Sequence, residues 1–583
     1  MSPGKHDKEQ SGPPPNRPGF DGPAELPRIY MKTSLADTPA PGRTIPVTDG
    51  NGLKQALESA ACGDTISLQA GATFVGLFTL PAKKCDDQHW IIVRSSAPGS
   101  ALPPQGTRLT PCYAGVAALP GRPDFHCDSP KNVMAKVVLA SHGSGPLHFA
   151  DGANHYRLIG LEVTRDIPGT VYNLALTDKD GVSDHIIYDR VWFHGVAQDE
   201  TNRGIALGGS TYVAVIDSTF TDFHCTAISG ACIDAQAIAG GTGANPMGPY
   251  KIVNNFLEGA AETIIFGGGF ANQAPADIEI RRNHMFKPLT WMPGNPQFVS
   301  ATDGRPFIVK NLFELKNATR VLLDGNILEN TWGGFSQQGF GILITPKNQA
   351  GAGGTNLCPA CSITDVTIRN CRISHVASGF QIGNGVSDNG GVPKAGERYS
   401  IHDVVVDDVQ PTLYKGSGVF AQYSMTPGSS KTPILRDVQI DHVTSFAPAA
   451  LFILGGPREE PRMFGLSFTN SILTVGDKPI MTTGGGPQRN CSALPDNRSA
   501  SQLLDDCFGT YAFHHNVIIG DGGWPKGNSN VRKLDDVGFV DFRNRNGGNY
   551  RLAGNSKFKH AATDGKDMGA DIDAIEKATQ GVQ

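Results

Sequence analysis

Carboxylates and amines interrupt apolar segments in the middle of this sequence, and they are the residues best suited to chemistry. Glu262 precedes an apolar run, while Glu314 and Lys316 alternate with apolar neighbours. An amine can act as a base when burial or nearby cations lower its pKa toward neutrality. Carboxylates can hold a divalent cation. The mixture predicts proton transfer on an acidic substrate.

The basic residues of this region are the candidates for catalysis. In β-elimination from a uronate, a cation neutralises the sugar carboxylate and a base removes the C5 proton. We expect Arg305 to neutralise the carboxylate, because guanidinium binds carboxylates well. Lysine is the better base on pKa grounds, and the candidates are Lys316, Lys310 and Lys287.

Three further groups complete the predicted site. Trp291 and Trp332 have aromatic faces that can stack on sugar rings. Polar residues of the predicted turns, expected to bind substrate, are Asp199, Glu200, Arg203 and Gln337. The carboxylates predicted to bind Ca²⁺, which takes several oxygen ligands, are Glu262, Glu314 and Glu258.

A repeated pattern shows which elements would position these side chains. Short apolar alternations with an asparagine between them recur, as in residues 278–286 and 321–328, with looser copies near residues 187, 213, 252, 366, 404, 438, 466 and 511. Repetition on this scale indicates a solenoid, and period-2 alternation makes its units strands. Asn255, Asn283, Asn326 and Asn516 are expected to stack at one corner, with Cys371 near the equivalent place.

The glycine-flanked strands that follow this corner are predicted to form one parallel sheet. Its members would begin near residues 172, 204, 235, 263, 313, 342, 380, 419, 451 and 480. Alternation directs residues such as Ile264, Phe266 and Phe313 inward. It directs Glu314 and Lys316 outward. Stacking of consecutive coils would therefore gather the charged residues into one groove.

The pattern resembles the right-handed parallel β-helix proteins of the pectate-lyase-like superfamily. The resemblance covers roughly residues 44–575 and includes an amphipathic segment, residues 52–60, like their N-terminal helical cap. It implies an all-β fold, a right-handed parallel β-helix with that cap. Calcium-assisted lyases of this superfamily use Lys and Arg on the same sheet. The sequence departs from them where glycines, and no lysine, follow the run that begins at Glu262.

Four regions are predicted along the chain. They are a disordered lead-in (1–25), a cap with an irregular region (26–150), the β-helix (151–525) and a closing segment (526–583). The lead-in has no apolar signal core, so either a signal was removed or export follows another route. A net charge of −5 argues against general nucleic-acid binding, and no apolar stretch approaches a membrane span. The oligomeric state stays open.

Eleven cysteines favour an oxidising, secreted or periplasmic setting. The predicted disulfides are Cys62 with Cys85, Cys112 with Cys127, Cys225 with Cys232, Cys358 with Cys361, and Cys491 with Cys507. Cys371 is left over. Reduced, buried thiols are the alternative.

Three functions remain open from the residues. The first is a lyase that cleaves uronate-containing polysaccharide. The second is a glycoside hydrolase that uses paired carboxylates such as Glu262 and Glu314, spaced by about 5 Å for a retaining reaction. The third is a non-catalytic carbohydrate-binding or surface protein, in which the groove charges are incidental.

Overall fold

The fold was analysed in a computed structural model of the chain. It describes residues 17–583 except 124–125, 179–180, 228–231, 335–336, 350–356, 388–389, 427–432, 460–461, 485, 487, 494–497 and 543–546. The first sixteen residues of the predicted lead-in lie outside this range.

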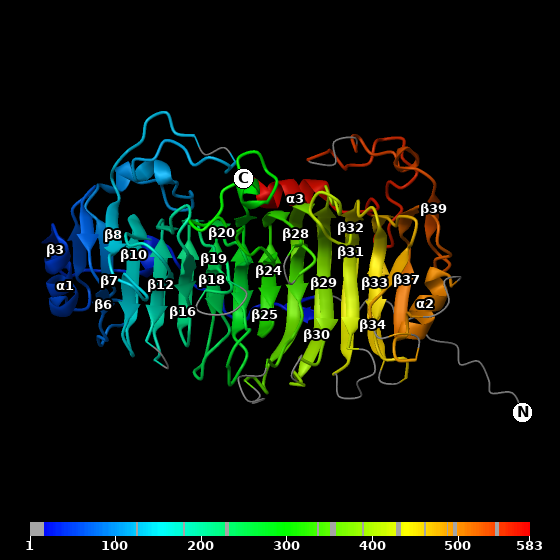
Figure 1. The fold of residues 1–583 in the computed structure, drawn as a ribbon, viewed down its shortest axis with the longest axis horizontal. Coiled ribbons are helices and arrows are strands. Elements are labelled where there is room, and N and C mark those ends of the chain that lie inside the picture. The colour runs from blue at the N-terminus through cyan, green and yellow to red at the C-terminus, as the bar shows by residue number, and fades with distance from the viewer. Residues whose placement is uncertain are drawn as a thin grey trace, which may run out of the picture.

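The described chain winds into a right-handed parallel β-helix, as the sequence predicted (Figure 1). One long sheet has the parallel strand order β6, β9, β12, β15, β18, β21, β24, β27, β29, β31, β33 and β36. Their bounds are Phe78–Leu80, Leu147–Phe149, Val171–Thr177, Thr201–Ala206, Gln236–Gly240, Glu262–Phe266, Asn311–Leu315, Phe340–Ile344, Ser378–Asn384, Val419–Met425, Ala450–Gly455 and Ile480–Thr482. We call it the site sheet, and it is the sheet predicted from the glycine-flanked strands.

The remaining parallel strands form two further faces. The first comprises β3 (Thr44–Val47), β4 (Thr65–Leu68), β7 (Ile91–Ser95), β10 (Asn154–Ile159), β13 (Asp184–Asp189), β16 (Thr211–Ile216), β19 (Tyr250–Val253), β22 (Ala276–Arg281), β25 (Ala318–Asp324), β28 (Ser362–Val376), β30 (Ala395–Val406), β32 (Leu435–Ser445), β34 (Met463–Thr469) and β37 (Phe508–His514). The second comprises β5 (Thr73–Val75), β8 (Ala135–Leu139), β11 (Leu161–Arg165), β14 (Trp192–His194), β17 (Thr219–Thr221), β20 (Phe256–Glu258), β23 (His284–Phe286), β26 (Ile327–Thr331), β35 (Ile472–Thr474), β38 (Val517–Ile519) and β39 (Ser529–Val531). The long strands β28, β30 and β32 run across both faces. Parallel pairing thus starts at β3 and β4, ahead of the boundary predicted at residue 151.

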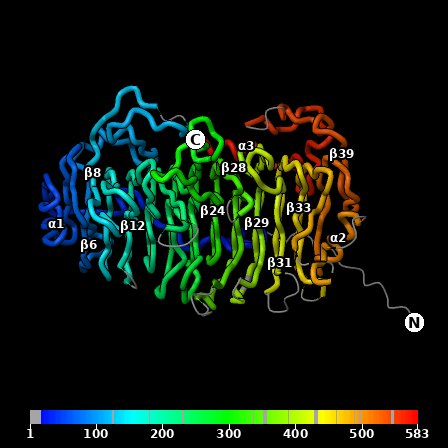
Figure 2. The backbone as a smooth tube through the Cα atoms, in the orientation of Figure 1, coloured from blue at the N-terminus to red at the C-terminus, as the bar shows by residue number. Residues whose placement is uncertain are grey.

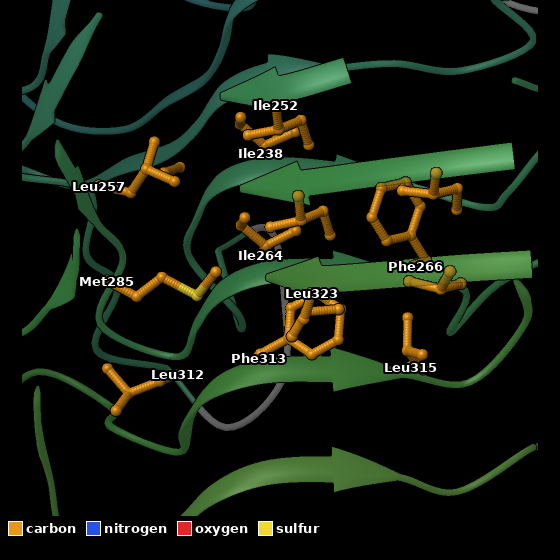
Figure 3. Close-up of a cluster of buried hydrophobic side chains, with 14 of the residues drawn as sticks. Ile238, Ile252, Leu257, Ile264, Phe266, Met285, Leu312, Phe313, Leu315 and Leu323 are labelled. Carbon is orange, nitrogen blue, oxygen red and sulfur yellow. The ribbon is translucent and has the colours of Figure 1, made fainter. Parts of the chain in front are cut away.

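The core lies between the faces and is built by alternation along each strand. Ile238, Ile264 and Phe313 pair in register on neighbouring strands of the site sheet, and all three are fully buried. Leu257 and Met285 come from another face and meet them inside the coil (Figure 3). Because inward residues are fixed by this packing, the side chains between them must point outward.

The predicted asparagine corner is confirmed. The amide nitrogen of Asn255 donates to Oδ1 of Asn283 at 2.9 Å, and that of Asn283 donates to Oδ1 of Asn326 at 3.1 Å. Each asparagine side chain also bonds backbone of the preceding coil, as when Oδ1 of Asn326 accepts from Asn283 N at 2.9 Å. The thiol of Cys371 continues the ladder, with Sγ 3.9 Å from Nδ2 of Asn326. Side-chain amides therefore satisfy backbone groups that the turn leaves unpaired.

Three helices lie outside the coils: α1 (Gly50–Ser59), α2 (Ala500–Cys507) and α3 (Ile572–Thr579). Helix α1 begins at Asp49, whose side chain accepts a hydrogen bond from Gly52 N, and buries Leu53, Ala56 and Leu57 against the first strands. It stands at the N-terminal end of the solenoid (Figure 1). Helix α3 packs on β28 and β30. Within the described chain, no helix combines the length and apolar character that crossing a bilayer requires.

Residues 17–25 are ordered, so the prediction of disorder is wrong for this part of the lead-in. Strands β1 (Phe20–Asp21) and β2 (Ala24–Glu25) form an antiparallel pair. From there the chain runs back along the outside of the coils; in Figure 2 this segment is the dark blue tube that passes behind them. Asp21 pairs with Arg369 at 2.8 Å, and Arg28 N donates to Asp277 at 2.8 Å. Polar contacts spread over several coils hold this segment, which its composition did not show.

All five predicted disulfides are present, and Cys371 is the free, buried cysteine. The pairs close short loops outside or between the strands, as their spacing predicted. An oxidising compartment would keep them formed.

Candidate functional site

A charged cluster lies on the outer side of β21 and β24, in the middle of the site sheet. We call Asp234, Glu262, Lys310, Glu314 and Lys316 the acid–lysine cluster. Glu262 pairs in register with Asn311, and Glu314 pairs with Ile265. Phe313 and Leu315 fill the core from the opposite side of β24. The predicted register therefore holds, and it brings Glu262, Lys310, Glu314 and Lys316 together.

Two lysines bridge the three carboxylates of the cluster. Nζ of Lys310 lies 2.6 Å from Oδ1 of Asp234 and 3.5 Å from Oε1 of Glu262. Nζ of Lys316 lies 3.1 Å from Oε1 of Glu314. Only 11% of the Lys310 side chain and 13% of the Lys316 side chain are exposed. These ion pairs are largely shielded from solvent, so they interact more strongly than surface pairs do.

Amide side chains extend the cluster along the solenoid. Nε2 of Gln236 donates to Oε2 of Glu262 at 2.8 Å, and Nε of Arg203 donates to Oε1 of Gln236 at 2.8 Å. On the other side, Nδ2 of Asn311 donates to Glu314 Oε2 at 2.8 Å and to Gln337 Oε1 at 3.0 Å. The polar network thus reaches from β15 to the turn before β27. Arg203 and Gln337, both predicted to bind substrate, belong to it.

Burial and charge shift the pKa values of the two glutamates of the cluster in opposite directions. Burial raises the pKa of Glu262, and the negative charges of Asp234 and Glu314 raise it further. Burial also acts to raise the pKa of Glu314, but the attraction of Lys316 and the hydrogen bond from Asn311 outweigh it and lower the value. Adjacent carboxylates with opposite shifts are typical of functional sites.

The two lysines are held in their charged form. Burial acts to lower the pKa of Lys316, but Glu314 and Glu262 outweigh it and raise the value. Burial likewise opposes the charge of Lys310, while Glu262 and Asp234 raise its pKa. In this arrangement both amines serve as cations rather than as bases.

Three oxygens of the cluster are of the kind that binds a cation, and two of them already face a lysine ammonium group. Oε1 of Glu262, Oε1 of Glu314 and Oδ1 of Asn311 are buried, and none accepts a hydrogen bond from the described residues. The two carboxylate oxygens face a lysine Nζ at 3.5 and 3.1 Å. Oxygen donors of this kind fit the preference of Ca²⁺. The predicted ligands Glu262 and Glu314 therefore suit the ion, together with Asn311, which was not predicted.

Lys287 is not a groove residue, and its assignment as a base is wrong. It is fully buried, and Nζ donates to the carbonyls of Gly259 at 2.7 Å and Asn311 at 2.8 Å. Burial lowers its pKa to about 7. The amine ties together the backbone that leads into β21 and β24. It thereby holds the strands that carry Glu262 and Glu314, and as a fully buried side chain it cannot reach a substrate.

The tryptophan prediction is also wrong. Trp291 is 1% exposed and Trp332 is 4% exposed. Both pack in a small apolar cluster with Phe307, Val309 and Tyr414. The loop from residue 287 to 310 needs an apolar core of its own, and the tryptophans provide it.

Other predicted residues lie apart from the cluster. Glu258 ends β20 on another face and binds Arg122 through Oε1 at 2.8 Å, so it is no ligand partner for Glu262. Glu200 accepts hydrogen bonds from the hydroxyls of Thr170 and Thr226, both at 2.7 Å. It shapes a loop and is not a free substrate ligand.

Two further predicted residues are surface loop residues. Arg305 is exposed and pairs with Asp303 at 2.6 Å. Within the described residues no hydrogen bond or ion pair joins it to the cluster. Asp199 accepts a hydrogen bond from the hydroxyl of Thr302 at 3.2 Å. Neither geometry supports a role beside Lys316.

Asp234, Gln236 and Asn311 were missed by the sequence analysis. Gln236 and Asn311 occupy the same strand position as Arg203 and Glu262 in successive coils. Aligning the strands on their inward residues Ile205, Ile238, Ile264 and Phe313 would have placed the four polar residues in one row, two positions earlier. Asp234 precedes its strand in a loop, so no periodic signal marked it.

Comparisons with known proteins give only distant likenesses. No protein-family model matches the chain, and no curated protein matches it. Among solved structures, a mannuronic acid specific polysaccharide family 6 lyase from human gut microbiota has a TM-score of 0.47 at 12% identity, over 85% of this chain and 92% of that one. A pectate lyase has a TM-score of 0.34 at 12% identity, covering 92% and 97% of the two chains.

An alginate lyase from Paenibacillus sp. has a TM-score of 0.31 at 15% identity, over 71% of this chain and 98% of that one. At these scores no residue role is transferred from these proteins. The β-helix rests on the strand pairing within the chain itself.

Proposed function

We propose that this protein is a secreted polysaccharide lyase that cleaves a uronate-containing polymer by β-elimination at the acid–lysine cluster. The observation that carries the proposal is the partial burial of Lys310 and Lys316 beside three carboxylates on the outer side of the site sheet. Burying charges is costly, and a structural solenoid needs none at this place. The five disulfides support an extracellular setting.

Lys310 would bind the uronate carboxylate. Its ammonium group is charged, so it can exchange one carboxylate partner for that of the sugar. Neutralising the sugar carboxylate makes the C5 proton acidic. Arg203, half-buried at the end of the amide row, would orient a neighbouring sugar.

Glu262, Glu314 and Asn311 would hold a Ca²⁺ ion. When bound, this ion would supply positive charge that stabilises the carboxylate as the C5 proton leaves. If the charges of Glu262 and Glu314 were neutralised, Lys316 would lose the two strongest contributions that raise its pKa, and burial would oppose its charge more effectively. Lys316 could then take the C5 proton. The electron pair would form the C4–C5 double bond as the C4–O bond breaks, and the leaving oxygen would take up a proton from water.

Lys316→Arg tests the role of the base. The arginine keeps the positive partner of buried Glu314 but does not deprotonate in proteins. We expect elimination, followed by the ultraviolet absorbance of the unsaturated product, to fall by at least about 100-fold. Lys316→Ala is less informative, because it leaves Glu314 buried without a cation. The control is Lys54→Arg on the exposed side of α1, which should keep wild-type activity. If Lys316→Arg is as active as this control, Lys316 is not the base.

Calcium binding is tested separately from activity. Calcium should raise the thermal unfolding temperature of the wild-type protein, since an ion that binds only the folded state stabilises it. Glu262→Gln and Glu314→Gln should lose this shift, whereas Glu58→Gln on α1 should keep it. A wild-type protein with no calcium response would remove the metal from the proposal.

A glycoside hydrolase is the second candidate. The pKa of Glu262 is raised and that of Glu314 is lowered, as expected of an acid and a nucleophile or base. A hydrolase would release saturated reducing ends without the unsaturated product. For a hydrolase, Glu314→Gln should abolish cleavage, and cleavage by the wild-type protein should not depend on calcium.

A further inference from the structure

A second group of potential ligands lies far from the acid–lysine cluster, near the N-terminal end of the solenoid. It consists of Asp87, His155 and His185, with one ligand atom from each, all within 4.8 Å of one another. Nε2 of His155 lies 3.3 Å from Oδ1 of Asp87, and Nε2 of His185 lies 4.0 Å from the same atom. We call these three residues the His–Asp group.

The fold makes the two histidines project from the coil. In the ladder of β10 and β13, Asn154 pairs with Asp184 and Tyr156 with Ile186, which leaves His155 and His185 outside the pairing. Both have positive φ, at 55° and 51°. Their rings stack with centroids 4.5 Å apart and planes inclined by 5°. The repeat of the solenoid therefore places two imidazoles side by side, facing the same way.

Contacts on the far side of each ring fix which nitrogen is free. Nδ2 of Asn154 donates to the carbonyls of Lys83 at 2.7 Å and Gly152 at 2.9 Å, so Oδ1 must be the atom that faces Nδ1 of His155 at 2.9 Å. An oxygen acceptor there requires a proton on Nδ1. Nδ1 of His185 lies 2.8 Å from Oδ2 of Asp184, and this negative charge favours a proton on the same nitrogen, although the geometry is not that of a hydrogen bond. In neutral rings, Nε2 then carries a lone pair.

The lone pair of His155 consequently faces an acceptor. His155 is 8% exposed, and its Nε2 lies within 3.3 Å of the Asp87 carboxylate with no proton between them in the neutral ring. A cation between the two atoms resolves this contact. Imidazole nitrogen selects transition metals over Ca²⁺ and Mg²⁺.

We propose that Asp87, His155 and His185 bind a divalent transition-metal ion of the Zn²⁺ class, with at least one coordination position open to solvent. The separation of 3.3 Å fits two ligands of a tetrahedral zinc ion, for which metal–nitrogen bonds of about 2.0–2.1 Å give an edge of roughly 3.3 Å. Carboxylate or amide groups behind ligating histidines, here Asp184 and Asn154, are typical of such sites.

The disulfide of Cys62 with Cys85 anchors the third ligand, because Asp87 follows Cys85 by two residues. The bound ion would join this loop to the coils that carry β10 and β13. It would therefore stabilise the N-terminal end of the solenoid, whatever the chemistry of the acid–lysine cluster.

The test uses the untagged, full-length protein with its disulfides intact. After treatment with chelator, the protein is incubated with ZnCl₂, passed over a desalting column and analysed for zinc and for thermal unfolding. We expect one zinc ion per chain and a raised unfolding temperature. Asp87→Asn, which changes an exposed side chain, should lose the bound zinc. Asp184→Asn should weaken binding by about 10- to 100-fold.

The matched control is His89→Ala, which removes an exposed histidine that pairs with Asp86 at 2.8 Å but lies outside the group. It should retain zinc as the wild type does. Equal zinc content in the wild type and Asp87→Asn, or no retained zinc in the wild type, would overturn the proposal. Both readouts are independent of enzymatic activity.

Discussion

At the scale of single residues, the acid–lysine cluster shows what alternation can and cannot predict. Glu314 and Lys316 were correctly directed outward, because Phe313 and Leu315 must fill the core. Lys287 was misplaced, because it directly follows β23 and its amine is buried against backbone carbonyls. A cation bound by backbone carbonyls has no sequence signature, since its partners Gly259 and Asn311 contribute carbonyls rather than side chains.

Lys287 gives a prediction about stability and pH. Burial lowers its pKa from 10.5 to about 7 in the folded protein. Between these values the unfolded chain binds more protons at this residue, so its contribution makes folding more favourable as pH rises from about 7 to 10.5.

Lys287→Met should therefore flatten the rise of the unfolding free energy with pH across this window. It should also cost about 1–3 kcal/mol, because the carbonyls of Gly259 and Asn311 lose their donor. Denaturant unfolding of both proteins at several pH values measures this. A variant that keeps the wild-type slope would show that Lys287 does not titrate there.

At the scale of elements, the strands of the site sheet were predicted closely, while the loops were not. Each inward residue is constrained by its neighbours in the stack, so a period of two is enough to place it. Trp291 lies in a long loop and Trp332 directly follows β26, and no period applies at either place. Trp291 and Trp332 pack under that loop, and Phe307 joins them from its far end. Only the folded loop shows this contact.

The asparagine ladder predicts an effect at this scale. Asn283→Ala removes the acceptor for Asn255 and the donor to Ile252 O at 2.8 Å. It should destabilise the protein by about 1–3 kcal/mol, since buried backbone groups lose their partners. The control is Asn272→Ala, an exposed residue whose side chain donates to Ala244 O at 3.2 Å. Asn283→Ala should lower the unfolding midpoint more than Asn272→Ala does. Equal shifts in the two variants would contradict a structural role for the ladder.

At the scale of the whole molecule, the stacking of coils explains how distant residues form one site. The cluster takes Asp234, Glu262 and Lys310 from segments separated by long insertions, because each strand lies beside the next. Composition could not predict the ordered residues 17–25, whose polar contacts reach residues far along the sequence, such as Asp21 with Arg369. The five disulfides were predictable, since short spacings limit the possible partners.

The cysteines allow a direct check of the folded chain. Under non-reducing conditions, native protein should take up no alkylating agent, because Cys371 is buried. Unfolded but unreduced protein should take up one equivalent per chain. Mass spectrometry of the intact chain reads this out, and any higher uptake would contradict the assigned pairs.

The central claim concerns bond cleavage at the acid–lysine cluster, and product analysis on uronate-containing polysaccharides tests it most directly. Wild-type protein is incubated with a panel of such polymers in the presence of calcium, and the fragments are analysed by mass spectrometry and ultraviolet absorbance. The account predicts fragments with an unsaturated, absorbing end that are lighter than hydrolysis products by one water, and their loss in Lys316→Arg. Saturated fragments, or no cleavage of any polymer in the panel, would contradict it.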